Sequence, residues 1–292
     1  MGALHDGHIE LVQRSLTHND ITVVSIFVNP AQFAPHEDLS TYPITFDSDM
    51  AMLEKVSVAQ IPQKSCVVFL PSVSDMYPSG IVQDVEEQKG TFIEVKGYGH
   101  QMEGKSRPTF FRGVATVVTK LFNVVQPNRA YFGQKDIQQA LLLRRLVRDL
   151  LMSFPSPENL VIVPTLRSSI DGLALSSRNV YLTNVERKFA GALFEALEAG
   201  RAIWNNQDGR SRDEVVAAAT TVIRMRAEEA ERQGIQMTLD YIEMNDPDSF
   251  DVVDWLSTHR ARPVILSGAL KIGRTRLIDN LLCGDSGDII SS

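Results

Sequence analysis

Hydrophobic positions along this chain form segments with helical spacing, separated by short runs that are almost continuously apolar. The helical spacing predicts helices at 8–16, 47–56, 114–125 and 136–152. The apolar runs predict strands at 21–28, 67–70, 130–132 and 160–163. Because helices and strands alternate, we expect an α/β fold, a doubly wound parallel sheet with helices on both faces.

The same pattern predicts which residues are buried. The runs at 21–28 and 67–70 are rich in β-branched and aromatic residues, which is typical of strands covered on both faces. In the helix expected at 136–152, the buried side is predicted to carry Leu141, Leu142, Leu146 and Leu150.

The alternation ends near Thr183. Two helices are predicted next, at 184–204 and 212–232, and then strand-like segments at 239–243, 263–266 and 276–282. This change predicts two domains, an α/β domain at 1–182 and a smaller α+β domain at 183–292. No linker rich in glycine or serine marks the boundary, so the division depends on the change of pattern alone.

Composition narrows the class of protein. The chain has 292 residues, of which 43% are hydrophobic and 22% charged, as in globular proteins that do not enter membranes. A net charge of −7 argues against a general binder of nucleic acid or of membrane surfaces. Cys66 and Cys283 lack metal-ligand spacing and predict free thiols in a reducing compartment, the cytoplasm.

The first eight residues carry the most informative chemistry. His5 and His8 stand just before the helix expected at 8–16, with Gly7 between them. A helix N-terminus favours an anion, and glycine allows the backbone to approach a phosphate closely. These features predict a nucleotide site. The alternative interpretation is that two polar histidines cap an ordinary surface helix.

A doubly wound nucleotide-binding fold places its phosphate-binding turn after the first strand. The sequence offers no room for such a strand before Met1. We therefore expect that the chain lacks this strand, that Met1 is an internal methionine of a longer protein, and that the chain as given is marginally stable and poorly active.

Polar residues also follow the predicted strands, where ligands bind in open α/β sheets. Asn29 and Gln32 follow the strand at 21–28. The strands at 130–132 and 160–163 are followed by Gly133, Gln134, Lys135, Asp136, Gln138 and Gln139, and by Leu175, Ser176, Ser177, Arg178 and Asn179. Lysine and arginine suit phosphates, and glutamine amides suit hydroxyl or carboxylate groups. Each group alone also fits a simpler interpretation, as a strand terminator, a helix cap, a polar turn or an exposed helix surface.

Taken together, these blocks resemble the pantoate–β-alanine ligases, an AMP-forming family. The family patterns M-G-A-L-H-x-G-H, S-I-F-V-N-P-x-Q-F, F-G-x-K-D-x-Q-Q and D-G-L-A-x-S-S-R-N match residues 1–8, 25–33, 132–139 and 171–179. Segments 112–118 and 275–280 also fit, so the resemblance covers nearly the whole chain. It implies a Rossmann-like fold of the histidine-motif nucleotidyltransferase type.

The resemblance also implies the reaction. The carboxylate of pantoate attacks the α-phosphate of ATP, which gives pantoyl adenylate and pyrophosphate, and the amine of β-alanine then displaces AMP to give pantothenate. Mg²⁺ is expected on the triphosphate of ATP, with no metal ligands assigned to the protein. Asn29, Gln32 and Gln139 are the implied substrate-binding residues, with Gln32 also near β-alanine. A homodimer is expected, with no nucleic-acid or membrane partner.

The implied ATP site combines three of the matched blocks with Leu166. Its residues are Met1, Gly2, Ala3, Leu4, His5, Asp6, Gly7, His8, Gly133, Gln134, Lys135, Asp136, Leu166, Leu175, Ser176, Ser177 and Arg178. Three of them are the implied catalytic residues: His8 as proton donor, His5 assisting at the phosphates, and Lys135 stabilising the charge that develops on the α-phosphate.

The chain departs from the family pattern in several places. Phe110 stands where many members have a histidine, so no role for that histidine carries over. Leu175 replaces a methionine, a mild apolar exchange. Segment 168–170 is one residue longer than usual, which makes the alignment of Leu166 less certain, and 57–64 is an insertion expected to form a surface loop.

Two other function classes remain compatible with the residues. One is a different nucleotidyl-transfer enzyme with the same histidine motif, or a fragment of a synthetase that charges tRNA, although the acidic composition speaks against RNA. The other is a nucleotide-binding or scaffold protein without activity. Lys135, Ser176, Ser177 and Arg178 favour a catalytic protein.

Overall fold

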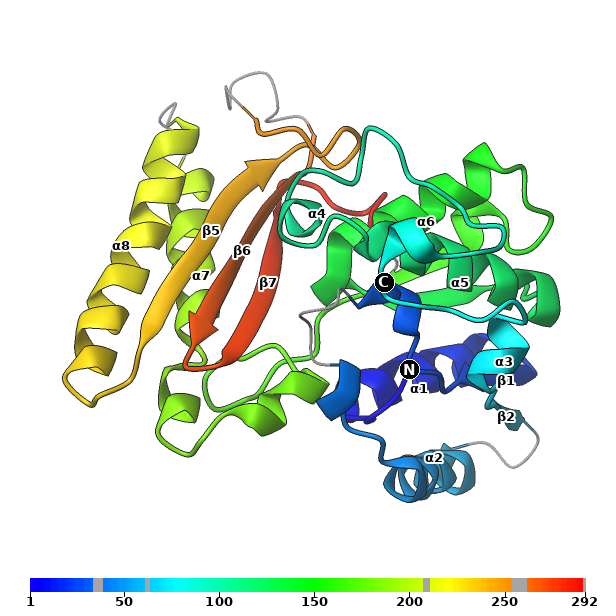
Figure 1. Ribbon diagram of the computed structural model, residues 1–292. Helices are drawn as coiled ribbons and strands as arrows, with labels where there is room; N and C mark the ends of the chain where they lie inside the picture. Colours follow the sequence, from blue (N-terminus) through cyan, green and yellow to red (C-terminus); the bar gives the residue numbers. More distant parts are fainter. Residues whose placement is uncertain (34–38, 61–63, 207–210, 254–261, 291–292) are drawn as a thin grey trace. The chain divides into compact units, whose positions relative to one another are not determined.

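The computed structural model describes residues 1–33, 39–60, 64–206, 211–253 and 262–290. The chain packs as two compact units, each assembled from separate stretches of sequence (Figure 1). The first contains Met1–Phe132 and Gln139–Val161, and the second contains Gly133–Gln138 and Ile162–Ser292. The short segment at 133–138 therefore packs with the C-terminal part of the chain, although its neighbours in sequence belong to the first unit.

The first unit is built on helices and a parallel strand pair. Its longer elements are α1 (Asp6–His18), β1 (Ile21–Ser25), α2 (Phe46–Gln60), β2 (Ser65–Phe69) and α5 (Phe110–Val125), with the short helices α3 (Val73–Met76) and α4 (Glu103–Ser106). β1 and β2 pair in parallel, with Ile21 opposite Ser65 and Ser25 opposite Phe69. The alternation of helix and strand predicted for this region is confirmed.

The predicted burial of the first two strands on both faces is wrong. Val24 is buried, but Ile21 is 62% exposed and Val23 is 38% exposed. Successive side chains of a strand point to opposite faces, and here α1 and α2 cover one face, where Val24 packs with Leu16 and Leu53. Val67 and Leu70, at and just beyond β2, are also exposed.

The insertion expected to form a surface loop at 57–64 is in part helical. Its first four residues continue α2 to Gln60, so the loop prediction is wrong for them. Residues 61–63 lie outside the part of the chain that the structure describes.

The division between the two units falls within three elements, β3 (Ala130–Gly133), α6 (Ile137–Asp149) and β4 (Leu160–Val163). β3 pairs with β4, and α6 lies between them in sequence. β4 has the predicted bounds and is largely buried.

The buried side of α6 differs slightly from the prediction. Leu142 and Leu146 are buried as predicted, and Leu141 is half-buried. Leu150 lies beyond the helix and is 47% exposed, so its predicted burial is wrong. The helix ends at Asp149, three residues earlier than its pattern indicated, and this removes Leu150 from the packed side.

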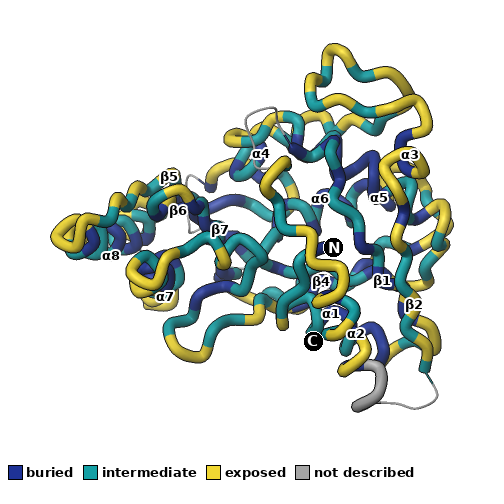
Figure 2. Tube along the Cα trace, turned by 60° about the horizontal axis from the view of Figure 1, so that its bottom comes forward, coloured by how far each residue is buried: buried dark blue, intermediate teal, exposed yellow. Residues whose placement is uncertain are grey.

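The second unit contains an antiparallel sheet covered by two helices. Its main elements are α7 (Ala192–Asn205), α8 (Arg212–Glu231), β5 (Met237–Asn245), β6 (Val264–Ile272) and β7 (Thr275–Cys283). The strands lie in the order β5-β6-β7, and α7 and α8 pack against the sheet and each other. The sheet strands contribute many of the buried residues, while the helices also have exposed residues (Figure 2). The predicted α+β arrangement is confirmed.

A domain boundary between residues 182 and 183 is expected from the change of sequence pattern. That residues 1–182 and 183–292 form separate domains stays a prediction. Among the described helices, none combines the length and the apolar character that crossing a membrane requires.

Candidate functional site

The N-terminal turn is closed by a histidine cap. His5 precedes α1, and its Nδ1 accepts the backbone N–H of Gly7 at 3.1 Å. A neutral His5 that accepts at Nδ1 carries its proton on Nε2. The rings of His5 and His8 lie 4.0 Å apart between centroids, tilted by 39°. The pair therefore presents two imidazoles side by side at the start of a helix, where an anion is favoured.

Hydrogen bonds to residues outside this turn hold it in place. Met1 lies beside the end of β1, where its carbonyl accepts the N–H of Phe27 at 2.8 Å. The N–H of Leu4 donates to Oδ1 of Asp49 on α2 at 2.8 Å, and Asp49 is 2% exposed. Ala3 has a φ of +48°, a left-handed conformation that side chains other than glycine rarely adopt. Such backbone strain persists only where the surroundings enforce it.

The segment after β1 is positioned by the side chain of Asn29. Asn29 is 2% exposed, its Nδ2 donates to the carbonyl of Gly113 at 3.1 Å, and its Oδ1 accepts from Tyr77 and from the N–H of Ala31. Burial raises the pKa of Tyr77 to about 12, so its hydroxyl stays a donor at neutral pH. The amide of Asn29 therefore braces the turn that presents the half-buried Gln32.

Helix α5 packs unusually close to the same turn. A Cβ added to Gly113 would lie 2.2 Å from the carbonyl oxygen of Ala31 and 2.7 Å from the backbone nitrogen of Gln32, so only glycine fits there. Arg107, just before α5, donates to the carbonyl of Gln32 at 3.0 Å. Its guanidinium also lies 4.0 Å from the ring centroid of Phe110.

Two glutamines lie side by side in sequence on α6, and neither is exposed. Gln138 is 2% exposed, and Gln139 is half-buried. The alternative interpretation of both as an ordinary exposed helix surface is therefore wrong. Gln139 lies in the first unit with Gln32.

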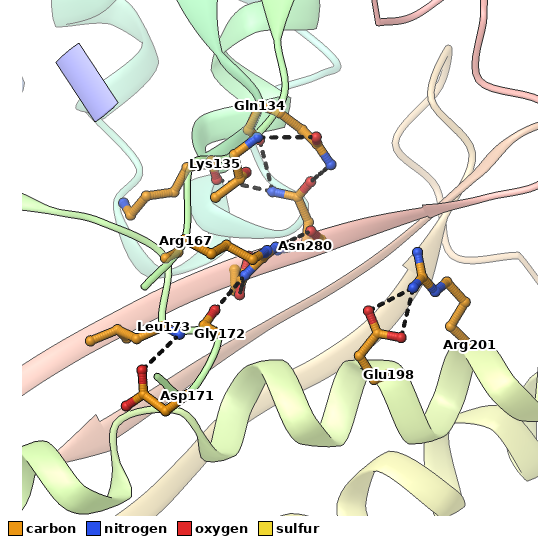
Figure 3. Close-up of polar contacts among 12 residues, drawn as sticks. Gln134, Lys135, Arg167, Asp171, Gly172, Leu173, Glu198, Arg201 and Asn280 are labelled. Carbon is orange, nitrogen blue, oxygen red and sulfur yellow. Dashed lines mark hydrogen bonds and ion pairs between the residues drawn. The ribbon is translucent and has the colours of Figure 1, made fainter. Parts of the chain in front are cut away.

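In the second unit, the loop that carries Lys135 is held by β7. The loop forms a single turn of 3-10 helix at Gln134–Asp136. Asn280 on β7 donates through Nδ2 to the carbonyls of Gln134 and Lys135, at 2.9 and 3.0 Å (Figure 3). The Lys135 side chain is 21% exposed and extends away from Asn280, with its ammonium 3.9 Å from the carboxylate of Asp136.

The residue preceding Asn280 holds a second loop. Asp279 forms a two-point ion pair with Arg167, at 2.5 and 2.8 Å, and Arg167 also donates to the carbonyl of Gly172. Burial raises the pKa of Asp279, against the opposing effect of the Arg167 charge. Two features require glycine at position 172. Its φ is +71°, and a Cβ added there would lie 2.1 Å from the Phe194 ring.

The loop at 166–175 folds back on itself. The N–H of Leu175 donates to the carbonyl of Leu166 at 3.1 Å, so these two predicted ATP-binding residues are neighbours. Ser176 then caps a short helix, its Oγ accepting the N–H of Arg178 at 3.3 Å. Ser177 and Arg178 are half-buried within this turn. Ser176 thus caps a turn, and this position is compatible with a binding role.

The structure thus arranges the predicted residues in two groups, one in each unit. The first group contains 1–8, Asn29, Gln32 and Gln139, and the second contains 133–136, Leu166 and 175–178. Among the described residues there is no cluster of three or more His, Cys, Asp or Glu side chains that could hold a metal ion.

Sequence reasoning missed the residues that brace these groups. They are Asp49, Tyr77, Arg107, Arg167, Asp279 and Asn280. A signal existed for the last two, because an Asp-Asn pair interrupts the apolar strand at 276–282. For the others, no local pattern distinguishes them from surface residues.

Comparisons with known proteins agree on one family. The family described as Pantoate-beta-alanine ligase matches residues 1–282. A pantothenate synthetase of Herpetosiphon aurantiacus is 42% identical over 97% of this chain and 91% of its own length. The pantoate–β-alanine ligase of Saccharomyces cerevisiae is 41% identical over 97% of this chain and 89% of its own.

Solved structures agree as well. A crystal structure of pantothenate synthetase from Thermus thermophilus superposes with a TM-score of 0.78 at 40% identity, covering 96% of this chain and 90% of that one. A Francisella tularensis pantoate–β-alanine ligase, crystallised with β,γ-ATP and β-alanine, has a TM-score of 0.68 at 32% identity and covers 97% and 87%.

Proposed function

This chain belongs to the pantoate–β-alanine ligase family, and on that premise we propose how its residues divide the work of the reaction. The enzyme condenses pantoate with β-alanine at the expense of ATP, through a pantoyl-adenylate intermediate, and releases AMP and pyrophosphate. The first step requires charge stabilisation on the phosphates, and both steps require close positioning of the reactants more than a covalent nucleophile.

The N-terminal turn is proposed to bind the phosphates of ATP. Residues 1–8 offer a helix N-terminus, Gly2 and Gly7 with no side chain in the way, and a strained backbone at Ala3 held by its surroundings. His8 acts as the proton donor as pyrophosphate leaves. His5 assists at the phosphates, and the cap at Nδ1 directs its remaining proton, on Nε2, away from the helix backbone.

Lys135 is proposed to stabilise the α-phosphate as negative charge develops during attack by the pantoate carboxylate. Gly133, Gln134 and Asp136 form the loop that presents it. Leu166 and Leu175 pack against the nucleotide, and 176–178 supply hydroxyl groups and a guanidinium for its phosphates. These assignments follow the family pattern residue by residue.

Gln32 and Gln139 are proposed to bind pantoate, and Gln32 also lies near β-alanine. Both side chains are half-buried, as expected for amides that line a site rather than fill a core. Asn29 acts on the substrate indirectly, because its donors and acceptors hold the turn that presents Gln32.

Mg²⁺ is proposed as the partner of ATP. Magnesium in such sites is usually held by phosphates, water and one or two carboxylates, so it needs no cage of protein side chains. When bound, the ion would neutralise charge on the triphosphate.

The fold is proposed to be of the histidine-motif nucleotidyltransferase type, with 1–182 carrying the nucleotide-binding function and 183–292 the smaller domain. A homodimer and a cytoplasmic location are proposed as well. The free Cys66 and Cys283 are compatible with a reducing compartment.

The observation that carries these proposals is the family match over residues 1–282, which runs through every predicted site segment. The test is release of pyrophosphate from ATP, measured with pantoate, with other carboxylates such as amino acids, and with no acid. We expect release with pantoate and the appearance of AMP only after β-alanine is added. Release that is independent of pantoate would contradict the assignment.

A further inference from the structure

We propose that Asn280 is a positioning residue for Lys135, so that the C-terminal sheet sets the place of the catalytic lysine. The inference rests on the proposed role of Lys135. It goes beyond that role because it assigns a function in catalysis to a residue on β7, 145 positions later in the chain.

The contacts of Asn280 are concentrated on the Lys135 loop. Its Nδ2 donates to the carbonyls of Gln134 and Lys135, and its Oδ1 accepts from Nε2 of Gln134 at 3.2 Å. The Gln134 side chain in turn accepts the N–H of Thr165 at 3.4 Å. The Asn280 amide thus fixes the backbone that carries Lys135 (Figure 3). The Gln134 side chain links the same loop to the loop after β4.

Asp279 and Asn280 act on different loops because neighbouring residues of a strand point to opposite faces. Asp279 lies on the face with Leu277 and Leu281, where it pairs with Arg167 beneath the 166–175 loop. Asn280 lies on the other face, toward the Lys135 loop. Two consecutive polar residues of β7 therefore hold two loops that are both proposed to contact ATP.

Packing alone does not explain an asparagine here. Asn280 is 2% exposed, and a buried amide is costly unless its polar atoms are paired. Each of its side-chain polar atoms is paired with the Lys135 loop or with Gln134. The charge of Lys135 also acts on the neighbouring Asp279, where it offsets a small part of the rise in pKa that burial causes.

The chain offers a matched control in Asn245. It lies on β5 of the same sheet, is fully buried, and donates through Nδ2 to the carbonyl of Phe250 at 2.9 Å. It therefore braces a loop in the same chemical manner, but the loop that it braces contains no proposed site residue.

The experiment compares Asn280→Asp with Asn245→Asp. The first keeps the size of the side chain but places an oxygen against the two carbonyls of the Lys135 loop. A catalytic group displaced by about 1 Å loses about a hundredfold in rate, so we expect adenylate formation to slow by about tenfold to a hundredfold. The KM for pantoate is expected to stay within about twofold, because its proposed ligands are untouched. Asn245→Asp is expected to leave the rate of adenylate formation near that of the wild type.

A second comparison separates positioning from general damage. In a Lys135→Ala background, Asn280→Asp is expected to cause no further loss of rate, because the group that it positions has been removed. Losses that multiply in the double variant, or an unchanged rate in the single variant, would overturn the proposal. If Asn280→Asp does not fold, Asn280→Ser replaces it under the same criteria, and failure of both to fold would assign Asn280 to structure alone.

The wild-type enzyme distinguishes this proposal from the proposed function. Pyrophosphate release by the wild type that does not depend on pantoate contradicts the function itself. Normal release by the wild type together with unchanged Asn280 variants contradicts only the role of Asn280.

Discussion

The two groups of site residues are braced in different ways. The N-terminal turn in the first unit is closed by neighbours in sequence, with His5 capping the helix that contains His8. The Lys135 loop in the second unit is held by Asn280, which is 145 residues away. Local bracing produces a motif that can be recognised in the sequence, whereas distant bracing produces a geometry that only the fold reveals.

In the first unit, too, some of the residues that hold the site segments are distant in sequence. Asp49 fixes the backbone at Leu4, and Gly113 lets α5 reach the turn that carries Gln32. The difference between the units is therefore one of degree. In the first unit, distant residues add to a local motif, and in the second they hold the loop that carries Lys135.

Substitution of Lys135 is expected to have the largest effect and is the strongest test of this comparison. We expect Lys135→Ala to slow adenylate formation by about 10²–10³-fold, because loss of one donor to a developing oxyanion costs about 3–4 kcal/mol. The folded state should be little affected, since the Lys135 side chain is 21% exposed. Single-turnover measurement of pyrophosphate release tests the rate, and thermal melting tests the fold.

Lys188 is the matched control in the same unit, because it is exposed and outside the proposed site. An unchanged single-turnover rate in Lys135→Ala would show that Lys135 and Asp136 only begin a helix. The second group would then contain no residue proposed to be catalytic.

The close approach in the first unit gives the next effect. Gly113→Ala would place a methyl group against backbone atoms of Ala31 and Gln32 that have no room to move. We expect a loss of about 3 kcal/mol in the free energy of unfolding, at the upper end of ordinary overpacking, and weaker binding of pantoate. Denaturant unfolding and the KM for pantoate measure the two effects.

Gly99→Ala is the control for this variant, because its added Cβ would meet no atom closer than 3.6 Å. Equal stability of the two variants would show that the backbone at Ala31 and Gln32 shifts at little cost. The turn that presents Gln32 would then be held less firmly than the geometry indicates.

The glutamines test whether the first unit carries the substrate. We expect Gln32→Ala and Gln139→Ala each to weaken pantoate binding by about 1–3 kcal/mol, the cost of leaving a polar partner unpaired in a site shielded from water. Affinity for ATP should change much less. Calorimetric titration with each ligand distinguishes the two. Equal losses for both ligands would contradict the placement of pantoate.

The sequence predicted the alternation of helices and strands, because that signal is periodic and local. Segment 160–163 forms β4 with the expected bounds, and the cap at His5 follows from residues two apart. The predicted burial of Ile21 was wrong, because which face of a strand is covered depends on where α1 and α2 pack. The Asp279-Asn280 pair stands out in an apolar strand, but the partners of Asn280 could not be predicted, because only the fold brings them together.

The smallest expected effect concerns the 166–175 loop in the second unit. Asp171 accepts the N–H of Leu173 and pairs with Arg187, with its side chain 23% exposed. Burial alone would raise the pKa of Asp171, but hydrogen bonds from Arg187, Ser168 and Leu173 lower it below its ordinary value of 3.8. A carboxyl group with a lowered pKa in the folded state stabilises the protein above its unfolded pKa.

That stabilisation is lost as the pH falls through the folded pKa. Asp171→Asn is therefore expected to cost at most about 1 kcal/mol at neutral pH, since the pair is partly exposed to solvent. The difference from the wild type should begin to shrink as the pH drops below 3.8, and it should vanish only below the lowered pKa of the folded state, where the native carboxyl is neutral. Melting curves at pH 7 and near pH 3 provide the measurement, with Asp213→Asn as control, because that side chain is 86% exposed in its pair with Arg212. A difference that stays constant across this range would mean that the charge of Asp171 does not hold the loop, and that the second unit relies on β7 alone.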